Sequence, residues 1–164
     1  MENYNILDFL KTFGINTKTN FDLKEHANFL GLPIKVLMNN ELYKIKNTKI
    51  HNRTESASRT ESASRRLGQG SNIIINLQNS NEQGSHWVAI KDKKYYFDSY
   101  GINPTKEVEE FLENDYVCNT IQVQPNGTKI CGVLCLFVLF QLYEGGDFED
   151  IVLEIHEDFE NLLK

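Results

Sequence analysis

Basic residues are in deficit in this chain of 164 residues, and long apolar runs are missing. Its 17 Lys and Arg residues are outnumbered by 23 Asp and Glu residues, so the net charge of −6 argues against general affinity for nucleic acid. The longest largely apolar stretch, Cys131 to Phe140, is too short to cross a bilayer, so no membrane partner is expected. The N-terminus has neither a basic lead nor an apolar signal core, and secretion is therefore not expected.

Cysteine is also scarce, and this limits metal chemistry and disulfides. Three cysteines cannot all pair with one another, and a reducing compartment with free thiols fits best. Cys131 and Cys135 are four residues apart on one predicted apolar helix, with no second pair of ligands, which makes a poor zinc site. No metal and no organic cofactor is expected.

The remaining composition, 40% hydrophobic and 24% charged, is ordinary for a soluble globular protein. The length fits one domain over residues 1–164. Apolar periodicity and turn residues predict an α+β fold, a small mixed sheet with helices packed against it. The predicted helices are 6–13, 21–30 (capped by Asn20), 104–113, 131–143 and 148–163, and the predicted extended segments are 33–38, 72–77, 87–91, 94–97 and 117–123.

A perfect hexamer repeat interrupts this pattern. Arg53–Ser58 is repeated at once as Arg59–Ser64, and the copies are rich in Ser and free of aromatic residues. Two such hexamers cannot build a solenoid, so residues 52–70 are predicted to be a flexible Arg/Ser-rich insertion. The alternative is a basic flap that touches substrate, a partner or nucleic acid.

Cys131 is a candidate nucleophile because it stands where a turn is predicted to become a helix. The partial positive charge and free N–H groups of a helix N-terminus favour a thiolate, and the same N–H groups can stabilise an oxyanion. Gly132 would let a substrate backbone approach closely. The alternative is a buried structural cysteine, which is the interpretation we give to Cys135.

His86 and Asp98 lie at the ends of a predicted hairpin. A two-residue turn at Asp92-Lys93 would bring them to within one position of direct opposition, where Asp98 could orient the imidazole. Trp87, next to the histidine, could exclude water. A lone histidine is more often structural, and Asp98 could instead cap a turn.

The other candidates for these roles are weaker or remain open. His26, His51 and His156 are less favourable as bases. Gln124, seven residues before Cys131, carries a neutral amide that can donate to an oxyanion without adding charge. Gln122 is also possible, since on a strand it would point the same way, and either glutamine could be an exposed polar side chain.

The chain resembles adenain-type proteases, and more broadly the ubiquitin-like-protein-specific cysteine proteases and related viral proteases. The resemblance rests on Ile74-Ile75-Asn76, Gly84-Ser85-His86-Trp87, Tyr96-Phe97-Asp98-Ser99-Tyr100-Gly101, Gln124-Pro125-Asn126 and Cys131-Gly132-Val133-Leu134-Cys135, and it covers about residues 71–143 well. It implies a papain-like/adenain-like fold with a buried helix that carries the nucleophile at its N-terminus. It also implies a catalytic triad of His86, Asp98 and Cys131, with Gln124 in the oxyanion hole.

By this resemblance the protein is expected to be a cysteine endopeptidase that processes capsid or other virion precursors. The source would be a DNA virus or virus-like element such as a virophage or polinton, with action in the host cytoplasm, the virus factory and the virion. An activating peptide is a further expected partner, with Cys118 as a displaced counterpart of the cysteine that holds it in adenain. DNA activation is not expected, because this chain is acidic.

Three alternatives remain. An isopeptidase acting on ubiquitin-like proteins would use the same triad, and only its substrate would differ. An acyltransferase on the same scaffold would consume an acyl thioester. A binding module without catalysis is disfavoured, because every part of the site is present in the sequence.

Overall fold

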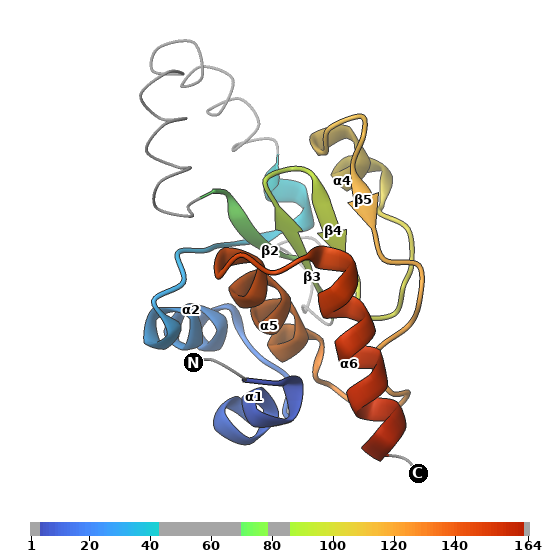
Figure 1. Cartoon of the computed structure of the whole chain (residues 1–164). Helices are drawn as coiled ribbons and strands as arrows, with labels where there is room; N and C mark the ends of the chain where they lie inside the picture. Colours follow the sequence, from blue (N-terminus) through green and yellow to red (C-terminus); the bar gives the residue numbers. More distant parts are fainter. Residues whose placement is uncertain (1–3, 43–69, 79–85, 163–164) are drawn as a thin grey trace.

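The computed structural model describes residues 4–42, 70–78 and 86–162 (Figure 1). Apart from Gly70, the predicted insertion at 52–70 lies outside these ranges, and so does His51. The helices in the described part are α1 (Ile6–Phe13), α2 (Asn20–Leu30), the short 3-10 helix η1 (Asn39–Glu41), α4 (Lys106–Phe111), α5 (Cys131–Tyr143) and α6 (Phe148–Leu162). The strands there are β1 (Lys35–Met38), β2 (Asn72–Asn76), β3 (Trp87–Lys91), β4 (Tyr95–Phe97) and β5 (Val117–Cys118).

The five described strands form one mixed sheet in the order β1-β2-β3-β4-β5. The two inner pairings, β2 with β3 and β3 with β4, are antiparallel, whereas β1 and β5 add to the edges in parallel. The structure is therefore α+β with a mixed sheet, as predicted. No helix of the described part combines the length and apolar character needed to cross a membrane.

The alternating residues of the strands divide the core between two faces of the sheet. Ile74, Ala89 and Phe97 face α5, whereas Ile75 and Tyr96 face the opposite cluster, to which α4 contributes Val108 and Phe111. Successive side chains of a strand point to opposite faces of the sheet, and here both faces are covered by helices. In Figure 1, α5 lies against the sheet, with α2 and α1 to one side and α6 to the other.

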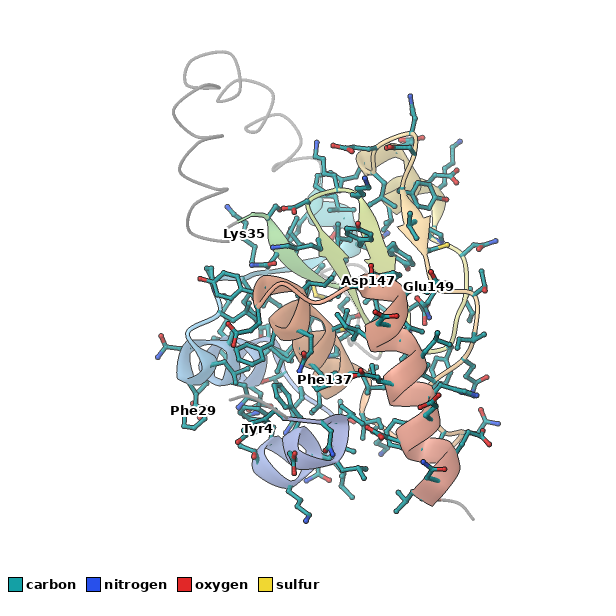
Figure 2. All side chains as sticks on the ribbon, in the orientation of Figure 1. Tyr4, Phe29, Lys35, Phe137, Asp147 and Glu149 are labelled. Atoms are coloured by element: carbon teal, nitrogen blue, oxygen red, sulfur yellow. The ribbon has the colours of Figure 1, made fainter. Side chains whose placement is uncertain are left out.

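Helix α5 is apolar around its whole circumference and is the centre of the larger core. Its residues from Cys131 to Phe140 are all buried. Phe137, labelled in Figure 2, packs edge-on against Phe9 of α1 with ring centroids 5.0 Å apart. A helix without a polar face is stable only when it is covered on all sides, so its position is strongly constrained by its neighbours.

Several predicted boundaries were wrong by a few residues. Thr19, rather than Asn20, caps α2, in a reciprocal capping box with Asp22. Helix α4 is shorter than predicted and is capped by Thr105, which follows Pro104.

The largest error concerns 117–123, where only Val117–Cys118 is a strand. The chain leaves the sheet because the side chain of Asn119 donates to the carbonyls of Asp98 and Ile121, and the N–H of Val123 donates to the carbonyl of Ser99 (2.9 Å). Hydrogen bonds to a side chain and to a neighbouring turn thus replace the strand-to-strand hydrogen bonds that the apolar pattern predicted for 119–123.

Glycine is required at position 101, where the turn after β4 touches the backbone of Ile121. Its φ of 71° is left-handed, and a Cβ built there would lie 2.8 Å from the carbonyl carbon of Ile121. Gly127 also has a left-handed φ, of 81°, but a Cβ there meets nothing within 4 Å. Comparing Gly101 with Gly127 therefore separates the cost of a left-handed φ from the cost of a clash with a Cβ.

Gly101→Ala is expected to lower the free energy of unfolding by about 3 kcal/mol, since strain and a backbone clash add. Gly127→Ala, which suffers only the strain, should cost about 1 kcal/mol. Urea denaturation of both variants measures the difference. Equal losses would contradict the close contact at Ile121.

Candidate active site

The loop of the hairpin formed by β3 and β4 is one residue longer than predicted. Asp92 and Lys93 adopt left-handed φ values of 56° and 58°, and the N–H of Lys94 donates to the carbonyl of Lys91 (2.9 Å). Lys91 pairs with Tyr95 rather than with Lys94, so the loop contains three residues. The predicted register was therefore wrong by one position.

This shift decides whether the candidate base and acid can meet. The paired residues end at Ala89 and Phe97, and extending that register by three positions sets His86 opposite Tyr100, with Asp98 two residues earlier on the same face. With the predicted two-residue turn they would have pointed to opposite faces, because a one-residue slip reverses every side chain. In the structure His86 Nε2 lies 2.9 Å from Asp98 Oδ1.

Asp98 is held tightly in this position. Its side chain is 1% exposed, and Oδ1 also accepts a hydrogen bond from the backbone N–H of Tyr100 (2.8 Å). Asn119 clamps its backbone, accepting from its N–H (3.0 Å) and donating to its carbonyl (2.7 Å). The carboxylate is thus fixed independently of the histidine that it contacts.

Cys131 is the first residue of α5, as predicted. The preceding residue, Ile130, provides no side-chain cap, so backbone N–H groups at this end stay available. Cys131 is 6% exposed, and it is one of the groups that raise the pKa of His86. Because Asp98 uses Nε2 of the ring, Nδ1 is the nitrogen left for the sulfur.

The electrostatics of His86 reflect these neighbours. Burial alone would lower its pKa, but hydrogen bonds and charge interactions with Asp98 and Cys131 outweigh burial and raise the pKa to about 9. The ring of Tyr100 lies against the imidazole, with centroids 5.2 Å apart and planes inclined by 32°. A ring with this pKa is an imidazolium at neutral pH.

Gln124 and Gln122 differ in a way that the sequence did not predict. They are not on a strand and do not point the same way: Gln122 is exposed, and its amide bonds to the carbonyl of Gln124 and to Asn126. Gln124 is 1% exposed, and its backbone N–H donates to the carbonyl of Ser99 (3.0 Å). Gln124 is therefore joined to the residue that follows Asp98.

Two neighbours of the cluster act differently from expectation. Gly132 was expected to admit a substrate backbone, but a Cβ there would lie 3.2 Å from side-chain atoms of Lys18 and Leu23, so its missing side chain makes room for this chain's own residues. Trp87 is buried, and its indole N–H donates to the carbonyl of Lys18 (2.9 Å). Both residues hold the segment between α1 and α2 against the start of α5.

The remaining titratable candidates do not join the cluster. His26 packs on Phe13, with ring centroids 4.6 Å apart, and His156 pairs with Glu160 at 4.0 Å. Cys135 is completely buried, which raises the pKa of its thiol, as befits a structural residue. Within the described ranges, no three His, Cys, Asp or Glu side chains are grouped so that they could hold a metal ion.

Sequence reasoning missed three residues that support the cluster. Asn119 clamps Asp98, Tyr100 covers His86, and Ser99 contacts Gln124. Ser99 and Tyr100 belong to the segment that carried the family resemblance, but no role was assigned to them. Nothing in the local pattern around Asn119 distinguishes it from an ordinary strand-end residue.

Comparison with known proteins finds a partial match to a viral protein named as a thiol protease. No protein-family model matches the chain. A mimivirus protein named "Putative thiol protease R355" (Acanthamoeba polyphaga mimivirus) is 32% identical over an alignment of 107 positions, and the match covers 52% of this chain. The match spans 35% of that protein, so the chain covers only about a third of its relative's length.

NMR titration of the histidines tests the electrostatics of this site. His86 should titrate near pH 9, whereas His26, whose pKa is lowered by burial, should titrate below 6.5. Asp98→Asn should lower the pKa of His86 strongly and Cys131→Ala less, because each removes a partner that favours the charged ring. Titration of wild-type His86 below pH 7 would contradict the geometry.

Proposed function

We propose that the protein is a cysteine endopeptidase with Cys131 as nucleophile, His86 as base and acid, and Asp98 as the residue that orients the imidazole. One observation carries the proposal: His86 bonds through Nε2 to a buried carboxylate, and Cys131, a thiol at a helix N-terminus without a side-chain cap, is among the groups that raise the pKa of His86. A nucleophile, a base and an orienting group within reach of each other define this chemistry.

In the proposed reaction the Cys131 thiolate attacks the scissile carbonyl carbon. The new C–S bond moves the carbonyl electron pair onto oxygen, where the free N–H groups of α5 and the amide of Gln124 stabilise it. His86 then gives its proton to the leaving nitrogen as the C–N bond breaks. In the second half, neutral His86 takes a proton from water, hydroxide attacks the thioester, and the thiolate leaves.

The proposed substrates are capsid or other virion precursors, cleaved during maturation at sites with small residues such as Gly. Support comes from the adenain-like order of the motifs and from the viral source of the similar protein. Action in the host cytoplasm, virus factory and virion belongs to the same proposal. An activating peptide would be compatible with it, whereas the net charge of −6 disfavours nucleic acid as an activator.

Cys131→Ala should abolish cleavage of a coexpressed capsid precursor, because no other described thiol lies beside His86. Cys118→Ala is the matched control and should leave cleavage unchanged when no activating peptide is present. Cleavage is followed by mass spectrometry of the products. Processing that continues in Cys131→Ala would refute the assignment, and reaction only with ubiquitin-like C-terminal probes would replace it with an isopeptidase.

The pH dependence of kcat/KM provides a separate check. The rate should fall as the pH rises through about 9, where His86 loses the proton needed by the leaving group. Asp98→Asn should move this alkaline limb to lower pH and reduce kcat/KM about tenfold or more at pH 8.

Asp92→Asn is the control for this change, since it alters a carboxylate at the far end of the same hairpin, where Asp92 accepts from the N–H of Ser71 (2.7 Å). Its alkaline limb should coincide with that of the wild type. An alkaline limb that Asp98→Asn leaves in place would contradict the orienting role.

A further inference from the structure

The amide of Gln124 is held at both of its polar atoms. Oε1 accepts a hydrogen bond from the hydroxyl of Ser99 (2.5 Å), and Nε2 donates to the carbonyl of Thr128 (2.9 Å). Ser99 is completely buried, and its carbonyl accepts from the N–H groups of Val123 (2.9 Å) and Gln124 (3.0 Å). These bonds fix the backbone of Ser99, and its buried hydroxyl donates to Gln124 from that position.

These partners select one of the two orientations of the amide. A backbone carbonyl can only accept, so Nε2 and not Oε1 must face Thr128. The hydroxyl of Ser99 then supplies the donor that the buried Oε1 needs, and the reversed orientation would set two carbonyl oxygens against each other. Nε2 carries two hydrogens, and within the described residues only the one on Thr128 has an acceptor.

We infer that Ser99 is a positioning residue that holds the Gln124 amide so that its second Nε2 hydrogen is presented to the oxyanion. The inference rests on the proposed function and assigns a role that the family resemblance left open. It also gives a reason for the close contact between the turn that contains Ser99 and the segment that contains Gln124. The acid that orients the base and the hydroxyl that orients the oxyanion donor are consecutive residues, Asp98 and Ser99, of a single turn.

A double-mutant cycle tests this role. Ser99→Ala should reduce kcat about tenfold with little change in KM, because a misoriented donor is lost only in the transition state. Gln124→Ala should reduce kcat about a hundredfold, and adding Ser99→Ala to it should then change kcat less than twofold. The pH of the alkaline limb should not move, since His86 keeps its partners.

Rates are expressed per reactive Cys131, counted by stoichiometric alkylation, so a partly unfolded variant does not imitate the effect. Ser99→Thr, which keeps the hydroxyl, should restore most of the wild-type kcat. Thr105→Ala removes a hydroxyl that caps α4 on the other face of the sheet and should lower stability without lowering kcat. An equal loss from Ser99→Ala with and without the Gln124 amide would overturn the inference.

The side-chain amide signals of Gln124 provide a readout that needs no peptidase activity. They should be a single sharp pair in the wild type and should broaden or double in Ser99→Ala, as the amide samples both orientations. Unchanged signals would overturn the role of Ser99. If the wild type cleaves no more than Cys131→Ala, the proposed function fails, while these signals still decide whether Ser99 orients the amide.

Discussion

A buried carboxylate is the constraint on which the site depends. Asp98 is 1% exposed, and a charge in such a place is tolerated only when hydrogen-bond donors surround it. His86 and the N–H of Tyr100 supply these donors, while Asn119 fixes the backbone on which the carboxylate is carried. Satisfying Asp98 therefore orders the end of the hairpin and the segment after β5 together.

Cys131, the proposed nucleophile, is positioned by a different force, the burial of an apolar helix. Helix α5 contacts the sheet, α1, α2 and α6, so its axis cannot shift without opening the core. Cys131 is placed by its position as the first helical residue, at the end where the helix has free backbone N–H groups. Hydrophobic packing thus positions the sulfur of Cys131, whereas hydrogen bonds orient the imidazole of His86 and the carboxylate of Asp98.

The parts predicted well from sequence are those with strong local signals. The apolar run after Cys131 predicted α5 and its start, and turn residues between strand-like segments predicted the hairpin. The register failed because a loop of two residues and one of three differ by little in local preference. The strand predicted at 117–123 failed because Asn119 found partners that are distant in the sequence.

By itself the sequence determined which groups are available: a thiol at a helix start, a histidine before a strand, an acid after one, and a glutamine seven residues before the thiol. Only the tertiary structure decided that His86 and Asp98 share a face, that Gln124 rather than Gln122 is buried, and that Ser99 holds its amide. Residue types and helix ends follow from short-range periodicity. Facing directions and hydrogen-bond partners depend on strand register and on contacts between segments 25 residues apart, as for Ser99 and Gln124, or 69 apart, as for Trp87 and Lys18, which no local pattern encodes.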